Sequence, residues 1–205
     1  QGLRLGDDDM LWLYDGTTNS IVSVNLKLRK ISRRFHDESI FAFGAFGEFG
    51  DIGTWDGRIG MFSLHREGNI GPTFMTVREG SDIRSIDFDP DSEVIFVLAG
   101  NPIYRIKPSG EGACRWNCWS PAPFSIRWIA RSQTLWCAGR GLEIIDLDRR
   151  DSITVEPNAY FKYVNVAASP GDEVACFGGD VDIFSSRGEL LRTIDCDSAK
   201  GVYRP

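Results

Sequence analysis

The sequence has few residues that could do acid–base or metal chemistry, and their spacing does not favour a catalytic centre. His36 lies beside Asp37 and Glu38, a combination that could transfer protons or bind a metal ion. No second ligand follows at a spacing typical of metal sites. We therefore expect His36 in a solvent-exposed loop, His65 in an exposed turn, and no metal site.

The five cysteines are an odd number without the spacing of a disulfide framework. This favours a reducing compartment, cytoplasmic or otherwise intracellular. Cys114 and Cys118 are four residues apart on an expected strand and so on one face of it, but no second pair completes a zinc site. Cys137 and Cys176 are expected to pack as small hydrophobic side chains. No phosphate-binding loop, dinucleotide fingerprint or hydrolase motif occurs, so no cofactor is expected.

The elements that would position these residues belong to a repeat of about forty residues. Five glycines that follow short apolar runs are spaced 39 to 43 residues apart, and they are Gly16, Gly57, Gly100, Gly139 and Gly178. In each unit one strand-like segment precedes the glycine, two follow it, and a fourth precedes the whole group. Four short strands joined by hairpin turns form one propeller blade, which cannot bury both of its faces alone.

The sequence therefore predicts an all-β fold, a β-propeller of five four-stranded blades, in a single domain over residues 1–205. No window carries a sustained helical period. Residues 200–205 are placed like the start of another first strand, which favours a ring closed by the two termini. The alternative is a part of a six- or seven-bladed propeller, excised from a longer chain.

Three turn sequences resemble those of WD40 and YVTN-type propellers. Residues 89–92 (Asp-Pro-Asp-Ser) and 169–172 (Ser-Pro-Gly-Asp) are similar to the Ser-Pro-Asp-Gly hairpin of these families. Asp56-Gly57 is similar to their Asp-Gly turn before the third strand of a blade. The Gly-His pair of WD40 repeats is absent, so the sequence resembles a WD40-like propeller rather than a WD40 protein. The resemblance implies scaffolding and recognition by loops around one mouth of the ring.

The net charge and the hydropathy of the sequence exclude some classes of partner. The net charge of −6 argues against a nucleic-acid backbone, which needs a basic surface, and is compatible with a basic protein or peptide. No apolar run approaches the roughly 20 residues that span a membrane. We expect no nucleic acid and no membrane partner, and the sequence does not indicate an oligomeric state.

The expected recognition surface combines acidic and large aromatic residues. It is formed by the segments that connect successive blades and by the turn between the second and third strands of each blade. The expected partner-binding residues are Asp37, Glu38, Trp55, Asp56, Glu79, Asp82, Trp119, Tyr160 and Phe161.

Three functions are open at this point. A non-catalytic protein-binding scaffold is favoured, and the alternative is a glycan-binding propeller lectin. The third is a glycoside-processing enzyme, which needs paired carboxylates near the propeller axis. The acids expected there, Asp82, Asp87 and Asp89, all lie in one blade, whereas such a site draws them from several. We therefore expect no enzyme activity.

Overall fold

The structure is a computed structural model, and it describes most of the chain. The described residues are 3–5, 10–15, 17–18, 20–36, 40–46, 49–54, 56–63, 73–77, 81–89, 91–107, 114–118, 122–155, 163, 165–169 and 173–196. All of their regular structure is β-strand. None of them forms a helix that is long and apolar enough to cross a membrane.

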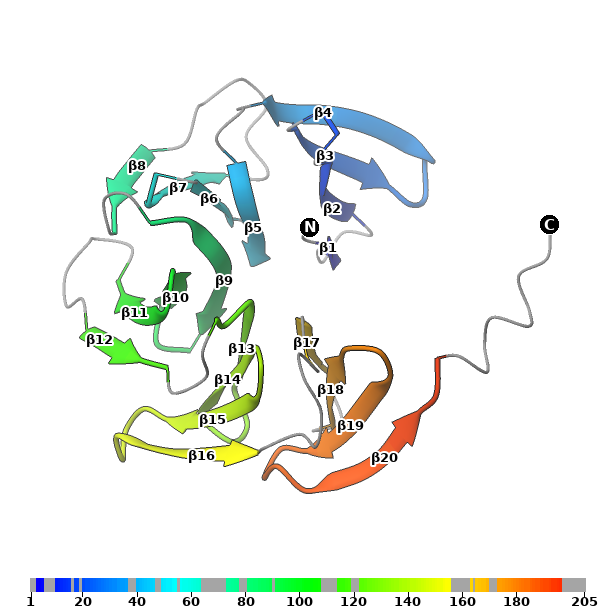
Figure 1. Cartoon of the computed structure of the whole chain (residues 1–205). Helices are drawn as coiled ribbons and strands as arrows, with labels where there is room; N and C mark the ends of the chain where they lie inside the picture. The colour runs from blue at the N-terminus through cyan, green and yellow to red at the C-terminus, as the bar shows by residue number, and fades with distance from the viewer. Residues whose placement is uncertain are drawn as a thin grey trace. The chain divides into compact units, whose positions relative to one another are not determined.

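Within the described residues, twenty strands form five four-stranded antiparallel sheets, and each sheet contains four consecutive strands (Figure 1). Sheet 1 is β1 (Leu3–Leu5), β2 (Met10–Asp15), β3 (Ser20–Asn25) and β4 (Lys30–His36). Sheet 2 is β5 (Ile40–Phe46), β6 (Phe49–Thr54), β7 (Arg58–Ser63) and β8 (Thr73–Thr76). Sheet 3 is β9 (Ile83–Asp89), β10 (Val94–Ala99), β11 (Pro102–Ile106) and β12 (Cys114–Asn117). Sheet 4 is β13 (Ser125–Ile129), β14 (Thr134–Ala138), β15 (Leu142–Asp146) and β16 (Asp151–Val155). Sheet 5 is β17 (Asn165–Ala168), β18 (Glu173–Phe177), β19 (Val181–Ser185) and β20 (Leu190–Ile194).

The strand order confirms the four-strand unit that the repeat predicts. His36 is a correction, because it lies at the end of β4, where it pairs with Ser20, and not in a loop. The segment 200–205 and His65 lie outside the described residues. The chain divides into two compact units, Gln1–Trp116 with sheets 1 to 3 and Asn117–Pro205 with sheets 4 and 5. The single domain over residues 1–205 stays a prediction.

In the first unit, a core forms between sheets 2 and 3. Its buried members are Ala42, Ile59, Ile83, Ile86, Ile95, Val97, Ala99 and Ile106. All six residues of β10 are buried, as expected for a strand that packs on both faces. Gly53 of β6 lies so close to β9 that a Cβ atom there would be 2.3 Å from Cγ2 of Ile83. The absence of a side chain at Gly53 therefore allows the two sheets to approach.

In the second unit, sheets 4 and 5 share the other core. Its buried members are Ile129, Trp136, Ala138, Leu142, Ile144, Tyr163, Val166, Val174, Cys176 and Phe184. The Trp136 and Phe184 rings have centroids 6.0 Å apart and are tilted by 59°, within the range that aromatic pairs favour. Cys137 and Cys176 are completely buried, which confirms their expected packing role. Sheets 2 and 3, and likewise sheets 4 and 5, therefore bury apolar residues against each other.

The strands of each sheet end at two opposite sides, which we call its edges and name by the turns at those strand ends. The linker edge carries the turn between its second and third strands and the segments that connect it to neighbouring sheets. In sheet 3 the amide of Gly100 donates to the Asp82 carbonyl (3.1 Å), and in sheet 4 the amide of Tyr163 donates to the Gly139 carbonyl (3.4 Å). Each bond joins the turn between the second and third strands to a connecting segment. The hairpin edge carries the first and third hairpin turns of the same sheet.

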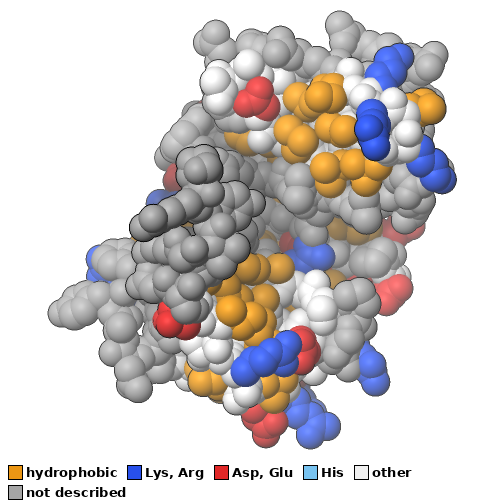
Figure 2. Space-filling model, turned by 90° about the vertical axis from the view of Figure 1, so that its right-hand side faces the viewer, with side chains coloured by type: hydrophobic (Ala, Val, Ile, Leu, Met, Phe, Trp, Pro, Cys, Tyr) orange, Lys and Arg blue, Asp and Glu red, His pale blue; other side chains and the backbone are white. Residues whose placement is uncertain are grey.

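Most of the described side chains of the outermost strands β12, β16 and β20 are exposed. Every residue of β20 is exposed, including Leu190, Leu191 and Ile194. Ile153 of β16 is 60% exposed. Figure 2 shows exposed hydrophobic side chains (orange) among Lys and Arg side chains (blue) on one face of the molecule.

Candidate functional site

Two of the nine expected partner-binding residues can be located in the structure, Asp56 and Asp82. The other seven lie outside the described residues, and they are Asp37, Glu38, Trp55, Glu79, Trp119, Tyr160 and Phe161. The expected recognition surface as a whole therefore stays a prediction. Asp56 and Asp82 both lie at the linker edge of their own sheets.

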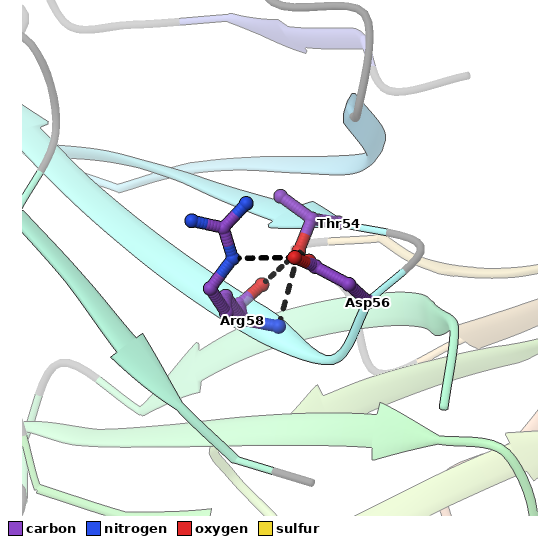
Figure 3. Close-up of polar contacts among 3 residues, drawn as sticks. All are labelled: Thr54, Asp56 and Arg58. Carbon is purple, nitrogen blue, oxygen red and sulfur yellow. Dashed lines mark hydrogen bonds and ion pairs between the residues drawn. The ribbon is translucent and has the colours of Figure 1, made fainter. Parts of the chain in front are cut away.

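Asp56 belongs to a compact polar cluster at the turn between β6 and β7 (Figure 3). The hydroxyl of the buried Thr54 donates to one carboxylate oxygen of Asp56, and the amide of Arg58 donates to the Thr54 hydroxyl oxygen at 3.0 Å. Nε of Arg58 lies 2.7 Å from the other Asp56 oxygen. Gly57 completes the turn with a φ of 86°, a conformation that glycine adopts readily.

This cluster keeps Asp56 ionised. The hydrogen bond from Thr54, and after it the contact with Arg58, lower the pKa of the Asp56 carboxyl. The side chain is 54% exposed, so it can meet a partner, but part of its charge is already compensated by Arg58. A carboxylate held this way suits electrostatic recognition better than proton transfer near neutral pH.

Asp82 is arranged in a similar way in sheet 3. Nε of Arg84 donates to its Oδ2 at 2.9 Å, and both side chains are about a quarter exposed, at 29% for Arg84 and 26% for Asp82. The Asp82 carbonyl also holds the Gly100 turn. Asp82 therefore contributes to the linker edge through a structural contact as well as through its charge.

The other acids expected near the propeller axis are also engaged in structure. Asp89 is 3% exposed, and its carboxylate accepts hydrogen bonds from the Ser92 hydroxyl (2.5 Å) and the Asp91 amide (3.2 Å). Asp87 is 8% exposed on the same strand. Within the described ranges, no three His, Cys, Asp or Glu residues come together as a metal site would require.

In the second unit, a buried acid joins a connecting segment to sheet 5. Asp182 on β19 is 1% exposed and accepts hydrogen bonds from the Tyr163 hydroxyl (2.5 Å) and the Thr193 hydroxyl (2.6 Å). Burial, and then the hydrogen bond to Asp182, raise the pKa of the Tyr163 phenol. Sequence reasoning did not find this pair, because Tyr163 and Asp182 are 19 residues apart and only the directions of their side chains bring them together.

A pocket of about 630 Å³ opens at the hairpin edge of sheets 4 and 5. Its walls include Arg131, Arg149 and Arg187, each from a different turn. Ile144 and Ile153 contribute apolar surface. The sequence analysis missed this site because the three arginines have no motif spacing and are brought together only when the two sheets pack.

The comparisons with known proteins concern the fold. No family model matches the sequence, and no curated protein matches it. A chain in the solved structure titled "Crystal Structure of Mitotic Checkpoint Complex" superposes with a TM-score of 0.77 over 94% of this chain. The fold is a β-propeller. Its five four-stranded sheets are the blades that the repeat predicts.

The likeness to this solved structure is one of fold alone, because the sequence identity is 14%. The propeller spans 62% of the length of the matched chain. The same fold carries many unrelated functions, so the function has to be argued from sites on its surface.

Proposed function

We propose that this propeller is a non-catalytic protein-interaction scaffold, and that the acidic and aromatic residues of its linker edges bind a basic protein or peptide. The observation that carries the proposal is the fold, because the matched chain belongs to a structure titled as a complex. The proposal applies that property to this chain by analogy of fold.

The geometry of the described acids supports a binding role. Asp56 and Asp82 form ion pairs with arginines of their own sheets, and Asp89 holds a turn. The hydrogen bond from Thr54 lowers the pKa of Asp56, whereas a general acid needs a raised one. A charged residue with a partner of its own still contributes to the field that a basic ligand meets.

The two other functions have less support. A propeller lectin would show the same aromatic and polar residues at equivalent turns, but residues 55–57, 139–141 and 178–180 are Trp-Asp-Gly, Gly-Arg-Gly and Gly-Gly-Asp. A glycosidase needs a pair of carboxylates facing one substrate, and the acids named above serve turns and ion pairs. An intracellular, reducing location is part of the proposal, and the five free cysteines support it.

The test uses a labelled peptide of alternating arginine and glycine and measures its binding by fluorescence anisotropy at several salt concentrations. The variant Asp37→Asn/Glu38→Gln removes two acids of the expected surface. Its matched control, Asp91→Asn/Glu93→Gln, removes two exposed acids from the first hairpin turn of sheet 3.

We expect the first variant to bind roughly fivefold more weakly at low salt, with the difference shrinking as salt rises, because exposed charges each contribute about 0.2–1 kcal/mol. The control should bind like the unaltered chain. Equal losses in the two variants would mean that net charge alone attracts the peptide, and the proposed surface would be abandoned.

A further inference from the structure

The pocket at the hairpin edge of sheets 4 and 5 has a composition unlike that of the chain around it. The chain carries a net charge of −6, but three arginines and two aspartates, Asp146 and Asp151, line this pocket. Four serine and threonine hydroxyls complete its polar lining. The site is therefore a local concentration of hydrogen-bond donors on an acidic protein.

Local hydrogen bonds fix the turns that present the arginines. In the turn after β13, Gln133 has a φ of 54°, and its Nε2 donates to the Ala130 carbonyl at 2.6 Å. In the turn after β15, one Asp146 oxygen accepts the amides of Asp148 (3.1 Å) and Arg149 (2.9 Å). Two of the three arginines, Arg131 and Arg149, thus lie on turns with a defined backbone.

The third turn is tied to the neighbouring sheet. Gly188 has a φ of 88°, and a Cβ atom there would lie 2.6 Å from Cδ1 of Ile144, which lines the pocket. The Gly188 amide donates to the Ser185 carbonyl at 2.9 Å, and the Arg187 amide lies 3.4 Å from the Ser185 hydroxyl. Glycine at this position lets the turn that carries Arg187 pack directly against sheet 4.

The charged side chains of the pocket differ in the number of hydrogen bonds and ion pairs that they already make. Asp146 accepts two turn amides and lies 3.4 Å from Nε of Arg149, and Asp151 accepts the amide of Ser152 at 2.8 Å. In the part of the chain that the structure describes, the Arg187 guanidinium makes no hydrogen bond or ion pair. A ligand therefore meets one guanidinium, that of Arg187, with its donor capacity unused, beside two carboxylates that already accept backbone amides.

We propose that this pocket binds the anionic side chain of a peptide segment, with a phosphorylated serine or threonine as the ligand that fits it best. A phosphate offers three strong acceptor oxygens to guanidinium groups and hydroxyls. The Ile144 and Ile153 surface contacts the apolar part of the segment. A cationic ligand would instead face three guanidinium groups, which outnumber the two carboxylates.

This site is independent of the proposed function. It lies at the hairpin edge instead of the linker edge, and it selects the opposite charge. Binding of a basic partner at the linker edge could fail without affecting it, and the reverse also holds.

The experiment measures fluorescence anisotropy of short Gly/Ala peptides with one central residue, which is phosphoserine, serine, glutamate or arginine. The test variants are Arg187→Gln and Arg149→Gln. The matched control is Arg150→Gln, because Arg150 is the exposed neighbour of Arg149 and does not line the pocket. Circular dichroism and thermal unfolding show whether each variant keeps its fold.

We expect saturable binding of the phosphoserine peptide and weak or absent binding of the serine peptide. Each test variant should lose roughly tenfold in affinity, the effect of one hydrogen bond to a charged group, while Arg150→Gln binds normally. Equal binding of the glutamate peptide would contradict the preference for a phosphate group. No binding of the phosphoserine peptide, binding that folded Arg187→Gln leaves unchanged, or preference for the arginine peptide would overturn the proposal.

Discussion

The sulfur atoms of Cys118 and Cys137 lie 3.6 Å apart in a buried site of the second unit. Cys118 follows the outermost strand of sheet 3, and Cys137 lies on β14 of sheet 4. Contact with Cys118, followed by burial, raises the pKa of the Cys137 thiol. The thiolate is the reactive form of cysteine, so this environment makes Cys137 unreactive.

Thiol labelling should therefore separate the five cysteines. We expect a maleimide reagent at neutral pH to modify the exposed Cys114 first and to leave Cys118, Cys137 and Cys176 unmodified until the protein is unfolded. Burial raises the pKa of Cys176 to about 12, which adds to its protection. Peptide mass spectrometry after timed labelling gives the order. Modification of Cys137 as fast as Cys114 in the folded protein would contradict the buried contact.

The close approach of sheets 2 and 3 predicts a steric effect at Gly53. Gly53→Ala places a methyl group against Ile83 and Ile86, and we expect it to lower the free energy of unfolding by about 1–3 kcal/mol, the usual cost of overpacking. Gly179→Ala is the matched control, because no atom lies within 4 Å of a Cβ there. Urea unfolding of both variants measures the difference. Similar midpoints for the two would show that the sheets can separate without cost.

The sequence predicted the strands far better than the sites, for a physical reason. A strand and its turn are determined by residues within a single repeat. Examples are the apolar run Val94–Ala99 and the turn glycines Gly57 and Gly100, which have φ values of 86° and 66°. Arg131 and Arg187 are 56 residues apart and meet only through packing of two sheets. A site formed by packing leaves no spacing pattern in a single sequence.

At the linker edge, too, the position of an acid could be predicted from the sequence but its side-chain contacts could not. Asp56 was identified as an acid in a turn, and the structure places it there. Its partners Thr54 and Arg58 lie two residues away on either side, so they were present in the turn sequence, but side-chain directions decide whether they bind the carboxylate. Composition therefore overestimates the free negative charge of this edge.

The buried pair Tyr163 and Asp182 predicts a loss of stability at alkaline pH. The folded state raises the pKa of the Tyr163 phenol above its ordinary value of 10.0, while the unfolded chain keeps that value. Above about pH 10 the unfolded state therefore releases a proton that the folded state retains, and the free energy of unfolding falls as pH rises. Below that pH the contribution is fully present.

Urea unfolding between neutral pH and pH 11 tests this with Tyr163→Phe. The variant removes one hydrogen bond to the buried Asp182, and we expect it to be about 1–3 kcal/mol less stable at neutral pH. Its stability should fall less steeply above pH 10, because the titrating phenol is gone. An alkaline slope identical to that of the unaltered chain would assign the pH dependence to other groups.

The turn cluster of sheet 2 predicts a hierarchy of effects on one carboxyl group. Thr54→Val keeps the shape of the side chain but removes its hydroxyl, so the pKa of Asp56 should rise toward its ordinary value. Arg58→Gln removes the ion pair but keeps a hydrogen-bond donor, and we expect a smaller rise, because the hydrogen bond from Thr54 is the largest single cause of the lowered pKa. Carboxyl NMR titration of Asp56 measures both.

Stability distinguishes the two variants as well. The Arg58 amide donates to the Thr54 hydroxyl, and Thr54 is fully buried, so Thr54→Val leaves that amide without its acceptor. We expect a loss of about 1–3 kcal/mol in the free energy of unfolding. Arg58→Gln, at a more exposed ion pair, should change it by less than about 1 kcal/mol. A larger pKa rise in Arg58→Gln than in Thr54→Val would mean that charge, and not the threonine hydroxyl, holds Asp56 ionised.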